Sequence, residues 1–385
     1  MVSTSAVMET QFAEDFRKLI GQEDDAAVRA LRERAFEYFA ANGFPTPKHE
    51  DWKYTNVAEI AKREWTVGKY GFALSELDED VRAAAERFSF ERNGFTALNM
   101  AFAEFAVVRI PKDTVVEEPI EFDFSAPAGH AVFPHVIVIA EAGSKATLAG
   151  VYKSEGSNFT NAAVQIIVED NASLTHYRIQ KESAEAFHYG STEITLGRGS
   201  SYNSTNINLG GAISRHDIDL KFTAEGGEAW VDGLYMVNGS QHADTHSIID
   251  HTVPNCISHQ NYKGVLNDHS RGVFNGKVFV RENAHGTDAQ QSNKNLLLSN
   301  DARVDTKPQL EIFNDDVKCS HGATVGQLEE EELFYLLTRG LPESLARNLL
   351  TYGFAEEIIN KIGIESIKSE LDRAVLNRLS AELEG

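Results

Sequence analysis

The chain has 385 residues, of which 42% are hydrophobic and 24% charged, so it can build a sizeable core spread over two or three structural units. With 36 basic and 58 acidic residues, its net charge of −22 disfavours nucleic acids and anionic membrane surfaces as partners. The longest apolar run, Val136 to Ala140, is too short to span a membrane, and no signal peptide follows the start methionine. Two cysteines form no disulfide framework. These features predict a cytoplasmic protein.

Residues 1–97 are predicted to form a helical domain. Apolar side chains recur at helical spacing over residues 8–20 and again over residues 25–41. The second helix is expected to stop at the turn signal Asn42-Gly43. A further short helix is predicted over residues 78–88.

Residues 98–325 are predicted to form a β-solenoid, which makes the chain mainly β. Short β-rich runs alternate here with Gly, Asn and Asp. Four turn-then-strand segments are equally spaced along the sequence, and their equivalent positions are Ser144, Ala172, Ser200 and Glu228. Segments that begin at Asn267 and Asn300 resemble further copies. A fixed period built from strands and turns indicates coils that bury their inner faces on one another. A β-sandwich would not explain three equal spacings.

Residues 326–385 are predicted to form a C-terminal helical domain. Four acidic residues, Glu329 to Glu332, suit a helix start because the helix dipole favours negative charge there. A stripe of apolar residues at helical spacing runs from Ile364 to Leu383. Such a stripe is typical of ordinary packing, and a terminal helical cap is also a common docking surface.

Common catalytic motifs are absent from the sequence, which contains no G-x-S-x-G, H-E-x-x-H or G-x-G-x-x-G. The segment Gly272 to Val278 resembles a phosphate-binding loop only superficially. It has three residues between its glycines where four are needed, and Val278 stands where Ser or Thr would hold Mg²⁺. Any nucleotide chemistry is therefore expected to come from a partner protein.

Histidines are concentrated late in the chain, with seven of the 13 between His242 and His321. On a strand, His242, Asp244 and His246 would share one face, as a two-histidine, one-carboxylate metal site requires. However, the two histidines would lie about 13 Å apart along the strand, too far to share one ion. We therefore interpret them as stacked residues of the solenoid.

The tripeptide Cys319-Ser-His321 lies where the solenoid is predicted to meet the C-terminal helices. On an extended strand the thiol and the imidazole share a face, with Cα atoms about 6.6 Å apart. Together they suit iron, zinc or an iron–sulfur cluster. The alternative is a buried, inert cysteine.

Three segments carry a resemblance to a known family: Asp51-Trp-Lys-Tyr-Thr55, Asp315 to Gly326, and Leu333 to Phe354. They are similar to the signatures of the SufB/SufD family, whose members are subunits of the SufBCD iron–sulfur cluster assembly complex. Where SufB proteins have a T-Q-C-D-like stretch, this chain reads Gln290-Gln-Ser-Asn293, and His321 is followed by Gly322 in place of glutamate. These differences favour the SufD branch.

The resemblance implies a right-handed parallel β-helix between two helical domains. It implies pairing with a SufB-like β-helix subunit and binding of a SufC-like ABC ATPase through the C-terminal helices. The sequence leaves the oligomeric state of the isolated chain open, and pairing of solenoids would allow a homodimer when SufB is absent. His321 matches a histidine of the nascent cluster site shared with SufB, and Cys319 matches its neighbour. No permanent cofactor and no enzymatic activity are implied. The residues expected to bind the ATPase are Leu333, Phe334, Leu336, Leu337, Arg339, Leu341, Leu345 and Leu349.

Two other classes of function remain open at this stage. One is a carbohydrate-active enzyme on a β-helix, which needs paired carboxylates or a basic residue in an aromatic-lined groove. We find no such convergent set in the sequence. The other is a standalone metal-binding adaptor.

Overall fold

The computed structural model describes residues 4–23, 25–69 and 78–381, with nothing stated of the side chains of residues 4–11, 380 and 381. Leu383, the end of the predicted apolar stripe, lies outside these ranges. Short helices and one short strand precede the main sheets: α1 (Thr4–Ile20), α2 (Ala26–Asn42), η1 (Glu50–Trp52), α3 (Ala58–Lys62), β1 (Thr66–Val67), α4 (Glu79–Arg87), η2 (Phe90–Arg92) and α5 (Gly94–Phe102).

Side-chain caps fix where these helices begin. The carboxylate of Asp25 accepts hydrogen bonds from two backbone N–H groups in the first turn of α2, and Asp78 accepts one from the first turn of α4. Asn93 and Thr96 form a reciprocal capping box at the start of α5. The two helices predicted over residues 25–41 and 78–88 therefore each begin one residue later than predicted, because the acidic residue caps its helix from outside.

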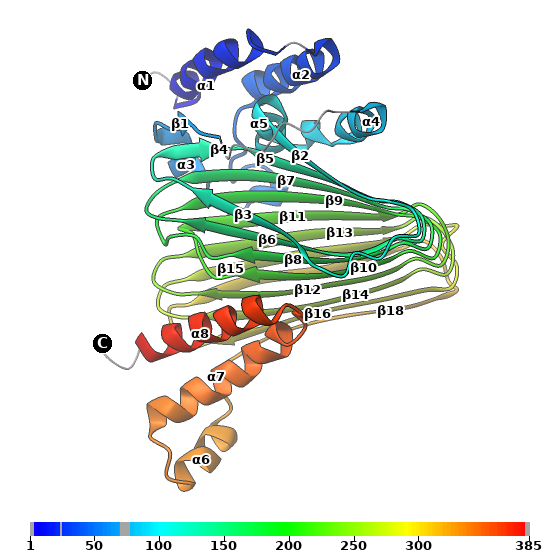
Figure 1. The fold of residues 1–385 in the computed structure, drawn as a ribbon. Coiled ribbons are helices and arrows are strands. Elements are labelled where there is room, and N and C mark those ends of the chain that lie inside the picture. The colour runs from blue at the N-terminus through cyan, green and yellow to red at the C-terminus, as the bar shows by residue number, and fades with distance from the viewer. Residues whose placement is uncertain (1–3, 24, 70–77, 382–385) are drawn as a thin grey trace.

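Parallel strands follow α5 and wind into two facing sheets (Figure 1). One sheet contains β1 and a series of later strands: β2 (Glu104–Ile110), β4 (His130–Val132), β5 (Pro134–Ala140), β7 (Phe159–Val168), β9 (Phe187–Leu196), β11 (Ile213–Phe222), β13 (His242–His251), β15 (Arg271–Val280) and β17 (Arg303–Ile312). The second sheet contains β3 (Ile120–Ala126), β6 (Lys145–Ser154), β8 (Ser173–Gln180), β10 (Ser201–Asn208), β12 (Glu228–Val237), β14 (Ile257–Leu266), β16 (Thr287–Leu297) and β18 (Val317–Gly326). From β5 onward, successive strands alternate between the sheets, which confirms the parallel β-solenoid.

A stack of similar turns explains the repeat in the sequence. The turns before strands β3 to β16 of the second sheet each have one residue with positive φ, and these residues are Asp113, Gly143, Asn171, Gly199, Gly226, Asn255 and Gly286. Gly, Asn and Asp tolerate this left-handed conformation best. Each of these residues donates its backbone N–H to a carbonyl of the next turn, as Asn171 does to Arg198 at 2.7 Å. The turns therefore form a ladder of their own.

The predicted period is correct for two steps and wrong for the third. Ser201 pairs with Ser173 at the predicted spacing, but Glu228 pairs with Ser201, which is one position short of it. The loop between β10 and β11, residues 209–212, is shorter than its counterpart between β8 and β9, residues 181–186, which shortens this coil. Later coils are longer than the predicted period. The supposed copies at Asn267 and Asn300 precede β15 and β17, so they belong to the turns of the other sheet.

Inward side chains of the two sheets form the solenoid core. Apolar residues dominate it, and the large aromatic members include Phe124, Tyr202, Phe222, Tyr262 and Phe274. The core also contains buried polar residues, among them Arg178, Glu182 and His188. His188 shares its two ring nitrogens between Glu182 at 2.8 Å and Arg178 at 2.6 Å. Burial of these groups is tolerated because each has a hydrogen-bonding partner.

Helices cover opposite ends of the molecule (Figure 1). The N-terminal helices pack an aromatic cluster, including Phe12, Phe39 and Phe95, against outward residues of the first sheet such as Phe159. At the other end follow α6 (Glu330–Thr338), α7 (Glu343–Ile359) and α8 (Glu365–Ala381). Helices α7 and α8 lie on the outer face of the second sheet, where the predicted stripe is buried from Ile367 to Leu379. Helix α6 has no buried residue.

Candidate functional site

Cys319 and His321 lie on β18, the edge strand of the second sheet and the last strand of the solenoid. In the parallel register Cys319 lies beside Ala289 and His321 beside Gln291, both buried inward residues of β16. Cys319 also packs against the solenoid core. Because side chains alternate along a strand, His321 faces the same way. We call the interior of the solenoid, into which these side chains point, the bore, and its end at the last coil the open end. The structure thus brings both predicted residues to the open end of the bore.

The two side chains differ in how accessible they are. Cys319 is half-buried, and this burial raises the pKa of its thiol. His321 is exposed at the mouth of the bore. A thiol with a raised pKa is a poor metal ligand until it loses its proton. The exposed imidazole is therefore the more available donor in the isolated chain. Cys256, the other cysteine, is buried, and burial raises its pKa as well.

The last coil exposes apolar surface as well as polar groups. Ile312 of β17 and Val325 of β18 continue inward-facing rows that are buried in the previous coil at Val280 and Asn295. Here they are 41% and 48% exposed, and Phe313 is 55% exposed. Both edge strands also present unpaired backbone groups on their free sides. This end is therefore suited to bind another protein surface that supplies strands.

His242, Asp244 and His246 form a network on the outer face of the first sheet, in which Asp244 is buried and the two histidines are half-buried. Asp244 receives a hydrogen bond from Thr55 at 2.5 Å, and His246 Nε2 lies 3.1 Å from the other carboxylate oxygen. Burial would raise the pKa of Asp244, but the charges of His246 and Arg215 outweigh it and hold that pKa well below its usual range. In the part of the chain that the structure describes, no three His, Cys, Asp or Glu residues are placed to hold a metal ion.

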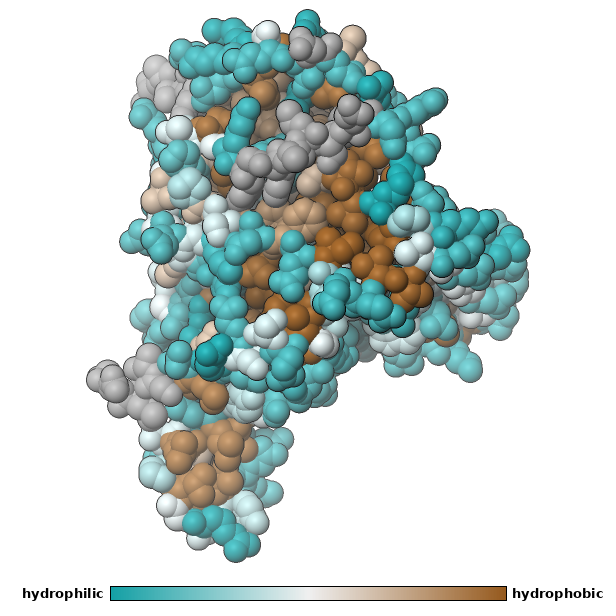
Figure 2. Space-filling model, in the orientation of Figure 1, coloured by the Kyte–Doolittle hydropathy of each residue, from teal (hydrophilic) through white to brown (hydrophobic). Residues whose placement is uncertain are grey.

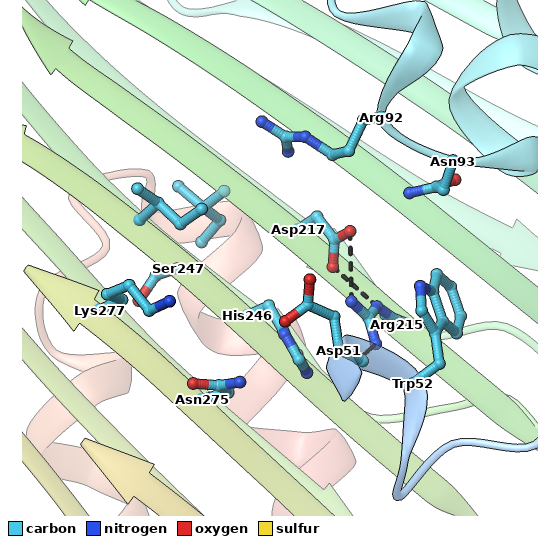
Figure 3. Close-up of a pocket in the computed structure, with 12 residues that line it drawn as sticks. Asp51, Trp52, Arg92, Asn93, Arg215, Asp217, His246, Ser247, Asn275 and Lys277 are labelled. Carbon is cyan, nitrogen blue, oxygen red and sulfur yellow. Dashed lines mark hydrogen bonds and ion pairs between the residues drawn. The ribbon is translucent and has the colours of Figure 1, made fainter. Parts of the chain in front are cut away.

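Arg215 is the centre of this network and anchors the segment Asp51 to Thr55. Its guanidinium lies 3.7 Å from the ring centroid of Trp52 and donates to the backbone carbonyl of Asp51 at 2.6 Å. It also bonds Asp217 at 2.8 Å and Asp244 at 3.0 Å. Figure 3 shows this clamp beside a pocket that Asn275 and Lys277 border on the far side. Because each acid of the clamp has a cationic partner, we interpret the segment as a structural anchor.

The residues predicted to bind an ATPase lie on α6, α7 and the turn between them. Four of them are exposed side chains of large hydrophobic residues, namely Phe334, Leu337, Leu345 and Leu349. Together with the exposed Tyr335 they form what we call the docking patch, the brown surface low in Figure 2. Leu333, Leu336 and Leu341 are half-buried, and Arg339 is exposed with its guanidinium 5.1 Å from the ring centroid of Tyr335.

Sequence reasoning missed two groups of residues that matter here. Arg215 and Asp217 share a face of a strand, and this spacing could have suggested an ion pair. The contact of Arg215 with Trp52 joins residues that are far apart in the sequence, so no local pattern predicts it. Gln291 was noted only as a departure from SufB. Gln291 lies beside His321 on the neighbouring strand. The spacing between these two residues is longer than the predicted period, so the sequence repeat did not pair them. Among the described residues, no helix is long and apolar enough to cross a membrane.

Comparison with known proteins identifies the class to which this fold and this site belong. Residues 122–354 match the family model described as SUF system FeS cluster assembly, SufBD core domain. Residues 7–89 match the model of the SufBD protein N-terminal region. The chain belongs to the SufBD family of iron–sulfur cluster assembly proteins.

Individual relatives of the chain include SufD proteins. It is 31% identical to the iron–sulfur cluster assembly protein SufD of Escherichia coli, over 89% of this chain and 90% of the relative. It is 29% identical to SufD of Bacillus subtilis, over 73% of this chain and 66% of the relative. A SufBD family protein of Synechocystis is 38% identical over 73% of this chain, and the match spans 65% of that relative. The resemblance to SufD is confirmed.

Proposed function

We propose that the chain is a non-catalytic scaffold subunit that pairs with a SufB-like β-helix protein and carries one side of a nascent iron–sulfur cluster site. The observation that supports this most directly is the position of His321, an exposed imidazole at the open end of the bore. A cluster assembled there would be cargo, held between His321 and ligands of the partner. Cys319, half-buried beside it, could add a thiolate after deprotonation.

A scaffold needs a partner surface, and the last coil supplies it. Exposed Ile312, Phe313 and Val325 surround the site, and the free edges of β17 and β18 can pair with strands. A second β-helix with a similar open end would bury these groups and enclose His321. The SufB-like subunit is the partner that family membership suggests.

We further propose that the docking patch binds a SufC-like ATPase. A helix of nine residues is unstable alone, and α6 has no buried residue and makes its main packing contact with α7. Its exposed aromatic side chains are typical of interface anchors. ATP-driven movement of such an ATPase would pull on α6 and α7, which are joined directly to β18 through residues 327–329.

The scaffold proposal is tested by co-expression of the tagged full chain with its neighbouring genes under anaerobic conditions. We expect a larger β-helix subunit and an ATPase to co-purify, together with iron absorbance that His321→Ala abolishes. Recovery of the chain alone and colourless would contradict the scaffold role. It would reopen the alternatives of a carbohydrate-active enzyme and a standalone metal-binding adaptor.

The docking proposal has its own test. Leu336→Asp and Leu349→Asp, and most sharply Phe334→Asp, place a charge in the apolar interface and are expected to weaken ATPase binding about 30-fold or more. Val115→Asp is the matched control, because Val115 is also an exposed apolar residue but lies in the turn that precedes β3. Binding measured by titration calorimetry that survives Phe334→Asp would exclude this surface.

A further inference from the structure

A chain of buried side-chain hydrogen bonds runs along the bore toward His321. Ser247 on β13, Gln260 on β14 and Gln291 on β16 all face inward and are at most 3% exposed. The amide of Gln260 donates to the hydroxyl of Ser247 at 2.9 Å. The amide of Gln291 in turn donates to the carbonyl oxygen of Gln260 at 2.6 Å. The series of hydrogen bonds therefore has a direction, because each side chain donates to the one farther from the open end.

The acceptor of this hydrogen-bonded series that lies nearest the open end receives no hydrogen bond. Oε1 of Gln291 is buried and lacks a hydrogen-bonding partner among the described residues. A buried polar atom left unpaired is destabilising, so such an atom marks a position where a donor is missing. Rotating the amide of Gln291 alone would not remove the defect, because its oxygen would then face the oxygen of Gln260. The chain thus requires a donor from the direction of the open end.

The solenoid is shaped to hold Gln291 in this place. Gly276 lies on the opposite wall of the bore, where a Cβ atom would clash with the amide nitrogen of Gln291 and lie 2.8 Å from its Cδ. The missing side chain leaves room for the amide. Gln291 is therefore fixed by its neighbour Gln260 on one side and by Gly276 on the other.

His321 is the side chain placed to supply the donor. It is paired in register with Gln291 on the neighbouring strand, about 4.8 Å away, and faces the same way. Its ring is exposed and free to turn toward the bore. A neutral imidazole has one N–H donor and one nitrogen with a lone pair. If the N–H is directed at Gln291, the lone pair is directed away from it, toward the open end.

We propose that Gln291 is the positioning residue of His321: its Oε1 accepts the imidazole N–H and so fixes one tautomer and one ring orientation. Metal-binding histidines commonly donate their second nitrogen to an oxygen acceptor, which prepares the first nitrogen for the metal. The consequence for this site rests on the proposed function, since it assumes that His321 binds the cargo. The hydrogen bond itself does not, because both of its groups belong to this chain.

The test uses the isolated full chain labelled with ¹⁵N-histidine, without metal or partner. Long-range ¹H–¹⁵N NMR reports the tautomer of each of the 13 histidines, and loss of a signal in His321→Ala identifies His321. Gln291→Met removes the acceptor at similar size and is expected to shift the ratio of the two tautomers about five-fold, the effect of one hydrogen bond.

Two controls separate positioning from general damage to the bore. Gln180→Met replaces another buried inward glutamine, far from the open end, and should leave the His321 signal unchanged. Thr306→Val removes a buried hydroxyl of the last coil that also lacks a partner, and it should leave the signal unchanged as well. Equal tautomer ratios in wild type and Gln291→Met, with both proteins folded by circular dichroism, would overturn the proposal.

A second measurement distinguishes this inference from the proposed function. In the co-expressed complex, Gln291→Met is expected to lower iron affinity about ten-fold or more, the usual effect of losing the acceptor behind a ligating histidine. If His321→Ala leaves iron bound while Gln291→Met still changes the tautomer ratio, the scaffold site is wrong and the positioning holds. If only His321→Ala removes iron and Gln291→Met changes neither readout, the positioning is wrong.

Discussion

At the scale of single residues, the molecule depends on polar groups held away from water. Arg215 is buried among two carboxylates and an indole ring, and His176 is buried in the bore with the hydroxyl of Tyr202 3.0 Å from its Nδ1. Such groups are stable only while their protonation and their partners remain as they are. They therefore give the sharpest responses to substitution and to pH.

His176 is expected to make the fold sensitive to acid. Burial lowers the pKa of His176 to about 4, whereas in the unfolded chain it stays near 6.5. The unfolded state therefore binds the proton first, so stability is complete above pH 6.5 and is lost as the pH falls toward 4. From pH 7 to pH 5 this histidine contributes a loss of about 2 kcal/mol.

The variant His176→Leu isolates that contribution. Urea unfolding at the two pH values should show that wild type loses about 2 kcal/mol more than the variant, because every other histidine is common to both. Equal losses in the two proteins would show that His176 is not the group responsible.

Arg215 is expected to be essential for the anchor of residues 51–55. Arg215→Met leaves Asp217 and Asp244 buried without their partner and should cost about 3–5 kcal/mol in urea unfolding. Arg198→Met is the matched control, since Arg198 is exposed and its loss should cost within about 0.5 kcal/mol. A small effect of Arg215→Met would refute the anchor role.

At the scale of elements, the sequence predicted the kinds of structure better than their register. Gly, Asn and Asp in the turns mark the coils because only a few residue types tolerate a left-handed backbone, and α2 and α4 begin one residue past their capping acids. The assignment of a turn to one sheet or the other depends on loops whose lengths vary along the solenoid, which no local signal records. Cys319 and His321 could be paired from spacing alone; Gln291 could not.

Glycines inside strands are expected to be needed for packing, in contrast to those in helices. A Cβ at Gly233 of β12 would clash with the ring of Tyr262, whose Cζ would be 2.8 Å away, so Gly233→Ala should cost about 1–3 kcal/mol or more. Gly353 of α7 has open space around it, and Gly353→Ala should stabilise by about 0.5–1 kcal/mol. Thermal unfolding of both variants checks the pair; changes of the same sign would contradict this reading.

At the scale of the whole molecule, the two ends of the solenoid differ. In the first coil, inward residues such as Ile110 and Phe124 are 1% exposed, and the N-terminal helices lie over this end (Figure 1). In the last coil, Ile312 and Val325 are largely exposed. The inward residues of the first coil are therefore covered by the protein itself, whereas those of the last coil are exposed.

The open end is expected to be where a second β-helix binds. The double variant Ile312→Lys, Val325→Lys places two charges in that surface and should abolish recovery of the β-helix partner, as measured by native mass spectrometry. Because both side chains are exposed, the melting temperature of the isolated chain should change little. Val115→Lys, an exposed substitution near the first coil, should leave the complex intact. A complex that survives the double variant would require another interface.

Having a single open end also limits how far assembly can proceed. Stacked parallel strands are a natural template for filaments, since each added coil offers the next one an identical edge. A filament needs subunits that can be extended in both directions. Here the N-terminal helices lie over the opposite end, so under the proposed pairing two subunits meet at their open ends and cover the free edges of β17 and β18 in both. Assembly then stops at two subunits, and the exposed strand edges that would otherwise favour aggregation are covered in the pair.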